Sequence, residues 1–490
     1  MTTSNTAALV LAAGLGTRMK SELPKVLHPI AGRAMILQLL DSLSEIEPER
    51  IVLVLGPDME AVSDAVRGAG YEFDVVIQKD RLGTGHAVQQ AQDTLSGYGG
   101  TVLVLYGDSP LITSETMADM LDARASAQDP AVVVLGFRPF DPAEYGRLIL
   151  DEAGSLAEIV ETKDASDEEL SNDLCNSGVM AIDGKVLFDL TAQLSDDNAK
   201  GEFYLTDIVG LAGESGRKCV VVEGDEEELI GINSRAELAV AETVLQDRLR
   251  ESVMENGATL TDPSSVYLAF DTQIGQDVTI GPNVFFGPGV EICDGVDIRA
   301  FCHIEGAFVE NNAIIGPFAR LRPGADIGEE VHIGNFVEIK NATLAAGAKA
   351  NHLSYIGDSK VGAKANIGAG TITCNYDGYT KSMTEIGAGA FIGSNTALVA
   401  PVKVGAGAIT GAGSVITQNV DADALAVTRS EQKSVEGYAA NFRAKNEPTA
   451  VSKPENEPGN EPGNEPEKEQ NVEGIVANLQ AKFGSDKDDA

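Results

Sequence analysis

The chain has 490 residues, of which 43% are hydrophobic, and its formal net charge at pH 7 is −39. That length is enough for two or three domains, and so negative a charge argues against nucleic acid as a partner. No apolar run reaches the roughly 18 residues of a membrane-spanning helix, and no basic segment precedes an apolar stretch at the N-terminus as in a signal peptide. The five cysteines are scattered without metal-ligand spacing, which favours a reducing cytoplasm.

Residues 7–230 alternate apolar runs with helical patterns. The expected strands are Ala7–Ala13, Ile51–Leu55, Thr101–Gly107 and Ala131–Gly136, and helices are expected over 34–46 and 84–95. Apolar strands separated by helices are typical of a mostly parallel sheet that is covered on both faces. We therefore predict a Rossmann-like α/β domain over residues 1–233. Ligands of such folds bind beyond the carboxyl ends of the strands.

A glycine-rich loop follows the first expected strand, in "LAAGLGTRMKSELPK". Gly14 and Gly16 let the backbone approach a ligand closely, and free N–H groups in such a loop can cradle phosphates. Arg18 and Lys25 add positive charge. The spacing matches neither a Walker A loop nor G-x-G-x-x-G, and a bare G-x-G also occurs as an ordinary strand-to-helix turn.

Asp108 follows another buried strand, in "LVLYGDSP". Taken alone, this residue could be a helix or turn cap. In the same domain as the glycine-rich loop it is better explained as a Mg²⁺ ligand, because Mg²⁺ takes one or two carboxylates together with phosphate oxygens.

Residues 234–256 contain neither Gly nor Pro and have apolar residues at helical spacing. These residues are Leu238, Ala241, Val244, Leu245, Leu249 and Val253. The pattern predicts one long linker helix.

Beyond about residue 265 the apolar residues recur every six positions. The three runs are Ile274, Ile280, Phe286, Ile292, Ile298 and Ile304; Ile315, Leu321, Ile327, Ile333 and Ile339; and Ile386, Ile392, Leu398, Val404, Thr410 and Ile416. This period indicates a solenoid, and we predict a left-handed parallel β-helix of hexapeptide repeats over residues 257–440. Slips in the phase mark loops that leave the coil, and the largest loop is expected over 373–385.

One phase slip contains "NHLSYIGD", residues 351–358. His303 and His332 end hexapeptide units, where a solvated outward side chain is expected, but His352 lies at the slip. Arg322 and Lys340 are one or two coils away. These cations favour a site for a sugar phosphate, and a histidine there supplies a base near neutral pH.

The tail, residues 441–490, contains "NEPGNEPGNEPEKEQ", and we predict that it is acidic and mostly disordered. Its last segment would place five apolar residues on one helical face: Val472, Ile475, Val476, Leu479 and Phe483. A frayed end and a short amphipathic helix that docks on another surface both remain open.

The motif G-x-G-T-R-M followed by Pro24 and Lys25 resembles the signature of sugar-phosphate nucleotidylyltransferases, and "QKDRLGTGHA" resembles their base-binding segment. The order of domains is similar to that of the bifunctional bacterial enzymes that make UDP-N-acetylglucosamine. Motifs agree along both domains, among them "EIVETKD", "CNSGV", "GPFARLRPG" and "NIGAGTITCNYDG". Leu15, where that family often has Lys, and the long tail are departures.

The resemblance implies two reactions. The C-terminal domain would transfer acetyl from acetyl-CoA to glucosamine 1-phosphate. The N-terminal domain would then transfer uridylyl from UTP to N-acetylglucosamine 1-phosphate and release pyrophosphate, giving a precursor of peptidoglycan and lipopolysaccharide. Mg²⁺, a cytoplasmic location and a homotrimer with acetyl-transfer sites between subunits are also implied.

The resemblance assigns roles to individual residues. Nucleotide or sugar-nucleotide contacts are implied for Leu11, Ala12, Ala13, Gly14, Lys25, Gln78, Gly83, Thr84, Tyr106, Gly107, Asp108, Gly146, Glu161, Asn176 and Asn233. Asp108 and Asn233 are the implied Mg²⁺ ligands, and Arg18 and Lys25 neutralise charge on the triphosphate. His352 is the implied base for the amine. The sugar-phosphate contacts are Arg322, Lys340, Tyr355 and Asn366, and the acetyl-CoA contacts are Ala369, Asn375, Tyr376, Ser394, Ala412 and Arg429.

Two alternatives stay open. The chain could be a single-activity nucleotidylyltransferase whose β-helix only oligomerises or regulates, or a non-catalytic scaffold. The residues around His352 argue against the first alternative, and the joint presence of Arg18, Lys25 and Asp108 argues against the second.

Overall fold

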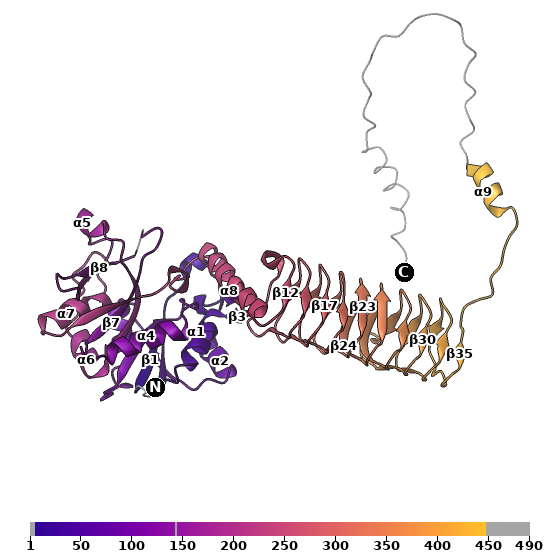
Figure 1. Ribbon diagram of the computed structural model, residues 1–490, viewed down its shortest axis with the longest axis horizontal. Coiled ribbons are helices and arrows are strands. Elements are labelled where there is room, and N and C mark those ends of the chain that lie inside the picture. The colour runs from indigo at the N-terminus through magenta and orange to yellow at the C-terminus, as the bar shows by residue number, and fades with distance from the viewer. Residues whose placement is uncertain (1–4, 143–144, 447–490) are drawn as a thin grey trace, which may run out of the picture. The chain divides into compact units, whose positions relative to one another are not determined.

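The structure, a computed structural model, describes residues 5–142 and 145–446. The chain divides into two units, Met1–Arg429 and Ser430–Ala490. The first unit contains an N-terminal α/β domain, a long helix and a β-helix, which follow one another from indigo to orange in Figure 1. No helix within the described residues is long and apolar enough to cross a membrane.

The N-terminal domain is built on a nine-stranded sheet whose main path runs β11-β7-β10-β6-β1-β4-β5. Its strands are β1 (Thr6–Leu11), β4 (Arg50–Leu55), β5 (Asp74–Ile77), β6 (Thr101–Tyr106), β7 (Val132–Phe137), β8 (Arg147–Leu150), β9 (Leu156–Val160), β10 (Cys175–Asp183) and β11 (Cys219–Glu223). β1 pairs in parallel with β4 and β6, and β4 with β5, whereas β10 runs antiparallel to its neighbours. The carboxyl ends of β1, β4, β5 and β6 therefore meet at one edge of the sheet.

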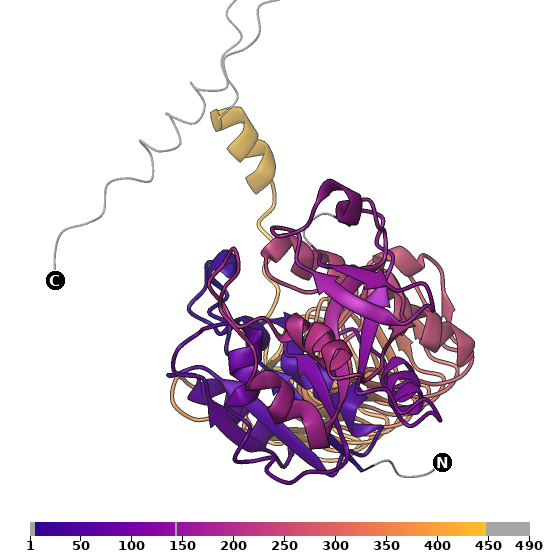
Figure 2. The same cartoon turned by 90° about the vertical axis from the view of Figure 1, so that its left-hand side faces the viewer.

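Helices cover both faces of this sheet (Figures 1 and 2). One face carries α1 (Met35–Ser44), α2 (Glu60–Gly68) and α4 (Ser114–Arg124), and the other carries α3 (Thr84–Gln89), α6 (Gly184–Thr191) and α7 (Ile208–Glu214). β1 and β7 are buried along their whole length, which explains why their sequences are continuously apolar. The helix expected over 84–95 is shorter than predicted. Residues 90–97 form turns in which most backbone N–H groups donate to the carbonyl three residues earlier.

The predicted linker helix is α8 (Arg235–Glu255). Ser234 caps its first turn by accepting a hydrogen bond from the Glu237 N–H. Leu238, Val244 and Leu245 pack on a small cluster of the N-terminal domain, and Leu249 and Val253 belong to the core of the β-helix. The helical spacing of these apolar residues is thus explained by two successive contacts along one helix.

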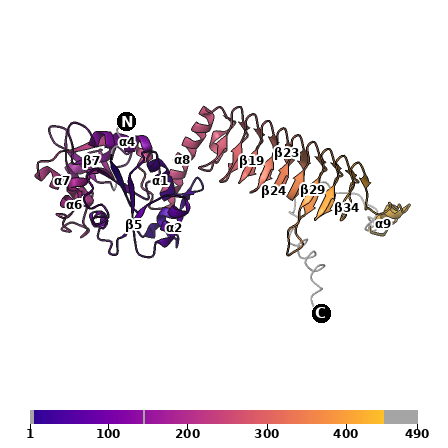
Figure 3. The ribbon, with the colours of Figure 1, turned by 90° about the horizontal axis from the view of Figure 1, so that it is seen from below.

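The β-helix stacks short parallel strands in three columns (Figures 1 and 3). The first column is β12 (Thr259–Leu260), β14 (Thr279–Ile280), β17 (Asp297–Ile298), β20 (Ile314–Ile315), β23 (His332–Asn335), β25 (Lys349–His352), β27 (Asn366–Ile367), β30 (Phe391–Ile392), β33 (Ile409–Thr410) and β35 (Leu425–Ala426). The second is β13 (Gln273–Ile274), β16 (Glu291–Ile292), β19 (Ala307–Val309), β22 (Ala325–Ile327), β24 (Glu338–Leu344), β26 (Tyr355–Val361), β29 (Thr384–Ile386) and β32 (Val402–Val404). The third comprises β15 (Phe285–Phe286), β18 (His303–Ile304), β21 (Arg320–Leu321), β28 (Ile372–Cys374), β31 (Ala397–Val399) and β34 (Val415–Ile416), and β24 and β26 bend to complete it.

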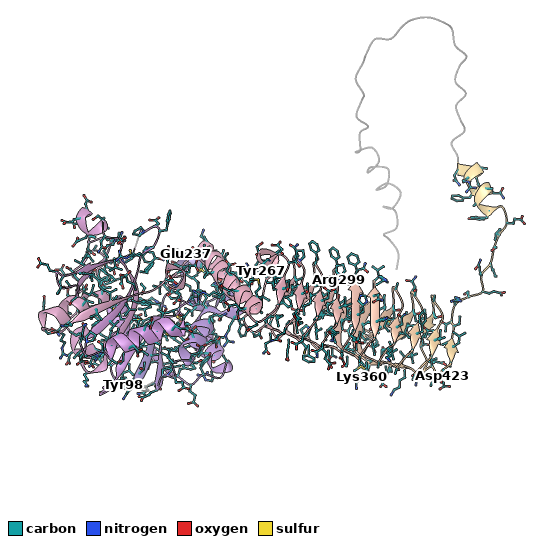
Figure 4. All side chains as sticks on the ribbon, viewed as in Figure 1. Tyr98, Glu237, Tyr267, Arg299, Lys360 and Asp423 are labelled. Carbon is teal, nitrogen blue, oxygen red and sulfur yellow. The ribbon has the colours of Figure 1, made fainter. Side chains whose placement is uncertain are left out.

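The six-residue period correctly identifies the core of the β-helix. All the wall residues of the three predicted runs are buried except Ile274, which is half-buried in the first coil. Charged side chains on the intervening turns and strands point outward, as Figure 4 shows for Arg299 and Lys360. The loop expected over 373–385 leaves the coil between Cys374 and Thr384.

The second unit is described only as far as residue 446 and contains α9 (Tyr438–Asn446), which buries no residue. The boundary that the sequence places between residues 440 and 441 falls inside this helix. The predicted amphipathic segment around Val472–Phe483 lies outside the described residues.

Candidate functional sites

The loop after β1 and the ends of β5 and β6 enclose a cavity of about 250 Å³ in the N-terminal domain. It is lined by Leu11, Ala12, Ala13, Gly14, Lys25, Val26, Gln78, Arg81, Gly83, Thr84, Ala87, Tyr106, Asp108 and Glu202. The Gln78 side-chain amide donates to the Gly83 carbonyl at 3.0 Å and so ties together two implied base contacts. Most of the nucleotide-binding residues implied by the resemblance therefore line one cavity.

Lys25, Asp108 and Asn233 form a polar group at this cavity. The Lys25 ammonium group donates to the Asp108 carboxylate and, at 2.9 Å, to Asn233 Oδ1. Asp108 follows β6, and Asn233 precedes α8. The backbone N–H of Ile232 donates to the Asp108 carbonyl at 2.9 Å, which fixes these two segments side by side.

The donor set of this group fits Mg²⁺. A carboxylate and an amide oxygen converge on the Lys25 ammonium group, and oxygen atoms are the ligands that Mg²⁺ takes. Residues 5–142 and 145–446 contain no cluster of three or more His, Cys, Asp or Glu side chains that could hold a metal ion. Two protein oxygens are enough where substrate phosphates and waters supply the remaining ligands of Mg²⁺.

Tyr106 connects this group to the residues implied to hold the sugar. Burial, followed by the negative charges of Asp108 and Glu161, raises the pKa of the Tyr106 phenol. Burial also raises the pKa of the Glu161 carboxyl, against the opposing charge of Lys200, whose Nζ lies 3.9 Å from Glu161. The phenol therefore stays protonated at neutral pH and remains a hydrogen-bond donor.

Gly146 and Asn176 lie together beside Glu161. The Asn176 N–H donates to the Gly146 carbonyl at 2.8 Å. A Cβ added at Gly146 would lie 3.3 Å from the Val160 carbonyl oxygen and 3.7 Å from Glu161 Oε1. A side chain at 146 would therefore crowd the Val160 carbonyl.

Six implied residues are not among those that line the cavity: Arg18, Gly107, Gly146, Glu161, Asn176 and Asn233. Arg18 is exposed on the loop, and Gly107 packs against Val26, whose Cγ1 would lie 3.1 Å from an added Cβ. Conversely, Arg81 and Glu202 line the cavity although the sequence did not single them out. Arg81 lies within the "QKDRLGTGHA" segment, but Glu202 carries no local signal because only the fold brings it there.

In the β-helix, four of the residues implied to serve acetyl transfer form a column on successive coils together with Asn335. Its members, in order, are Asn335, His352, Ala369, Ser394 and Ala412. Asn335 and His352 are register partners, and the His352, Ala369 and Ser394 carbonyls accept hydrogen bonds from the next coil at 3.3, 2.7 and 2.8 Å. Arg429 closes the column by donating to the Ala412 carbonyl at 2.6 Å.

His352 is exposed, and its Nδ1 lies 2.8 Å from Asn335 Oδ1. An amide oxygen can only accept a hydrogen bond, so Nδ1 carries the proton in this arrangement. In the neutral imidazole with this tautomer, Nε2 keeps its lone pair and can accept a proton. Asn335 was missed in the sequence, although it occupies the matching place one coil earlier, in "IGNFVE".

A group of cations lies on the neighbouring surface. Arg322 and Lys340 follow register partners on adjacent coils, and Arg322 pairs with Glu338 at 2.8 Å. Contact with the positively charged Lys381, followed by burial and the charge of Arg322, lowers the pKa of the half-buried Lys340. Three cations held this close favour an anionic ligand. Lys381, which sequence reasoning missed, belongs to the expected loop 373–385.

Asn375 and Tyr376 lie in that loop. Asn375 is buried and donates to the Asp358 carboxylate, so it anchors the loop to the coil. Tyr376 is exposed and pairs with Lys381 across the loop. Tyr355 begins β26, and Asn366 begins β27 three positions before Ala369 of the column.

Comparisons with known proteins match both domains. A model of the MobA-like NTP transferase domain matches residues 8–168. A model of the bacterial transferase hexapeptide (six repeats) matches residues 271–306, 306–341 and 383–418. The first match contains the glycine-rich loop and Asp108, and the second covers the predicted hexapeptide region on both sides of His352.

Curated relatives align with almost the whole chain. The bifunctional protein GlmU of Paramagnetospirillum magneticum is 59% identical over 453 residues, which are 92% of this chain and 100% of that protein. The bifunctional protein GlmU of Rhodospirillum rubrum is 63% identical over 90% of this chain and 98% of its own length. That of Sphingopyxis alaskensis is 55% identical over 89% of this chain and 96% of its own length.

Proposed function

This chain belongs to the bifunctional GlmU family, and we propose that its two transferase activities are carried by the two sites described above. The β-helix transfers acetyl from acetyl-CoA to glucosamine 1-phosphate. The N-terminal domain transfers uridylyl from UTP to the product, N-acetylglucosamine 1-phosphate. The observation that carries this proposal is the presence in one chain of both the Lys25–Asp108–Asn233 group and the column around His352.

In the N-terminal site, an oxygen of the sugar 1-phosphate attacks the α-phosphorus of UTP while the bond to pyrophosphate breaks. Both reactants are anions, so the main task of the protein is to hold them together and offset their charge. Lys25 neutralises phosphate charge, and the loop N–H groups around Gly14 position the triphosphate. Asp108 and Asn233 would hold Mg²⁺, which would supply further neutralisation of the phosphates. Gly146, Glu161 and Asn176 orient the sugar.

Arg18 is an exposed cation of the glycine-rich loop. Arg18 can bind the triphosphate if the glycine-rich loop moves toward a bound nucleotide. The loop N–H groups and this side chain would then contact the same phosphates. Lys25 already lines the cavity, so the two cations have different starting positions.

In the β-helix, Nε2 of His352 accepts a proton from the amine of glucosamine 1-phosphate. The amine nitrogen attacks the thioester carbonyl of acetyl-CoA, and the C–S bond breaks to release coenzyme A. Arg322 and Lys340 bind the sugar phosphate, with Tyr355 and Asn366 as further contacts. Lys381 adds a third cation beside Lys340.

Acetyl-CoA would extend along the column beyond His352. Ala369, Ser394 and Ala412 offer small side chains on successive coils about 4.8 Å apart. Asn375 and Tyr376 border this run from the loop, and Arg429 lies at its far end. A run of small side chains leaves room for an extended ligand along the solenoid.

A homotrimer and a cytoplasmic location belong to the same proposal. Phe301, Phe318 and Phe336 stack on one corner of the β-helix, with ring centroids 4.9 and 5.1 Å apart. All three are 45% or more exposed and have positive φ angles, which are unfavourable for bulky residues. Such an apolar ridge fits self-association. Light scattering that gives the mass of a single chain would contradict the trimer.

The experiment that tests the function supplies glucosamine 1-phosphate, acetyl-CoA, UTP and Mg²⁺ and identifies the products by mass. We expect UDP-N-acetylglucosamine, pyrophosphate and free coenzyme A. Omitting UTP or Mg²⁺ should stop the reaction at N-acetylglucosamine 1-phosphate, and omitting acetyl-CoA should prevent every product. Uridylyl transfer to added N-acetylglucosamine 1-phosphate without any acetyl transfer would instead support the single-activity alternative.

A further inference from the structure

The Arg81 side chain lies in a space bordered by the backbone at Ala13 and Gly56. Its Nε–H donates to the Ala13 carbonyl at 2.7 Å, although the two residues are 68 positions apart. Gly56 lies beside the guanidinium group, and a Cβ at that position would overlap it. The φ angle of Gly56 is not positive, so the backbone conformation does not demand glycine there. Room for the Arg81 side chain is a sufficient reason for it.

This position of the Arg81 side chain is where ligands bind in α/β domains. Ala13 follows β1, Gly56 follows β4, and Arg81 is four residues beyond the end of β5. These three parallel strands are neighbours, so their carboxyl ends bring the guanidinium group to the ligand-binding edge of the sheet. Among the described residues no carboxylate forms an ion pair with Arg81, and its remaining N–H groups are available to an anion.

Arg81 and Gly14 also border two cavities at once. The first is the nucleotide cavity with Gln78, Lys25 and Asp108. The second, of about 310 Å³, lies between the glycine-rich loop and residues 57–59. Arg81 is the one cation among the residues that line this second cavity, which also include the carboxylates of Glu22 and Asp58. Without Arg81, the charged side chains that line this cavity would all be carboxylates.

We propose that Arg81 binds the pyrophosphate half of UTP, the β- and γ-phosphates, and the same group as it leaves. This inference rests on the proposed uridylyl transfer. The nucleoside occupies the side of the first cavity with Gln78 and Gly83, so a triphosphate that extends past Gly14 toward the second cavity passes the guanidinium group. Arginine suits this role because its planar fork can hold two phosphate oxygens while Nε keeps the Ala13 carbonyl.

The test compares Michaelis constants in both directions of the uridylyl reaction. In Arg81→Gln, KM for UTP and KM for pyrophosphate in the reverse reaction should each rise about 10- to 100-fold, the loss expected for one charge-assisted hydrogen bond. KM for the UDP-sugar should stay unchanged, because this compound does not carry the β- and γ-phosphates of UTP. Arg81→Lys should show a smaller rise in the same two constants, because the charge remains while the fork is lost.

Gly56→Ala tests the same contact without touching Arg81. The added methyl group takes the space of the Arg81 guanidinium group, so KM for UTP and KM for pyrophosphate should rise. The double variant Gly56→Ala/Arg81→Gln should show little further rise over Arg81→Gln alone. The matched control is Arg67→Gln, an exposed arginine paired with Asp64 on α2, which should leave every constant unchanged. Acetyl transfer by the same preparations reports that the chain is folded.

An unchanged KM for pyrophosphate in Arg81→Gln would overturn the proposal, and so would an equal rise in KM for the UDP-sugar. If Arg81→Gln also loses acetyl transfer, Arg81→Lys and Gly56→Ala decide by the same criterion. A wild-type chain that makes no UDP-sugar would refute the proposed function itself, which is a different outcome.

Discussion

Asp358 joins the coil of the β-helix to the loop that carries Asn375 and Lys381. Its carboxylate accepts hydrogen bonds from the side-chain amides of Asn375 and, at 2.6 Å, Asn341. Burial alone would raise the pKa of Asp358, but these two amides and the charges of Lys381 and Lys340 outweigh it and lower that pKa. The ionised carboxylate therefore holds the loop in place.

We expect Asp358→Asn to loosen residues 375–383 in a pH-dependent way. Because the pKa of Asp358 is lower in the folded chain than the value of about 3.9 in an unfolded one, the stabilisation is complete above that value and disappears as the pH falls through the folded pKa. Hydrogen exchange of loop amides should be faster in Asp358→Asn near pH 7, and the difference should shrink below about pH 4.

Asparagine is a suitable replacement because it tolerates the positive φ of residue 358. The control is Asp326→Asn on an exposed position of β22, which should not change exchange in the loop. A difference between Asp358→Asn and wild type that is the same at every pH would contradict the role assigned to the charge.

Candidate site residues can be proposed from sequence where a local pattern carries the signal. Asp108 is a candidate because a carboxylate follows a buried strand, and His352 is a candidate because it interrupts a regular repeat. Asn233 is different: it meets Lys25 across 208 positions of sequence, and spacing gives no indication of that contact. Arg81 and Lys381 were missed for the same reason, since each depends on a partner that only the folded chain supplies.

The helix α8 is held to the first coils of the β-helix by polar as well as apolar contacts. The Gln246 side chain donates to the Leu268 carbonyl at 2.6 Å and accepts from the Leu268 N–H at 2.8 Å. One turn later Arg250 donates to the Val266 carbonyl at 2.9 Å. Gln246 is 1% exposed, so its two bonds satisfy backbone groups that water cannot reach.

Replacing Gln246 by leucine should destabilise this junction by about 2 to 4 kcal/mol, because each of two buried backbone groups loses its partner. Urea unfolding of the full chain, followed by a probe in the first coils, measures the change. The control is Glu251→Leu on the exposed side of the same helix, which should change the free energy of unfolding by less than about 0.5 kcal/mol. Equal losses in the two variants would show that the hydrogen bonds of Gln246 are not responsible.

Helices and strands could be predicted from sequence where their apolar residues follow a single regular spacing. The period of six placed the walls of the β-helix, and the helical spacing placed α8, because each pattern reflects burial along a single direction. α3 was predicted too long because its apolar pattern continues beyond Gln89. The turns that follow the helix also bury apolar side chains, so the pattern does not mark where the helix ends. The loop at 373–385 was found because it breaks the repeat.

At the scale of the whole molecule, the two proposed sites serve consecutive reactions in one chain. The product of the proposed acetyl transfer is the acceptor of the proposed uridylyl transfer. The residues assigned to the two sites belong to different domains with separate hydrophobic cores. Their sequence signals are independent as well, a phosphate loop in one and a broken hexapeptide repeat in the other. The two activities should therefore be separable by mutation.

The most direct measurement of this claim determines both half-reactions in His352→Ala and in Asp108→Ala. His352→Ala should lower acetyl transfer about 10²- to 10⁴-fold, as expected for loss of a general base, and leave uridylyl transfer at the wild-type rate. Asp108→Ala should abolish Mg²⁺-dependent pyrophosphate release and leave acetyl transfer intact. If both activities fell together in either variant, or if neither changed, the account of two independent sites would be wrong.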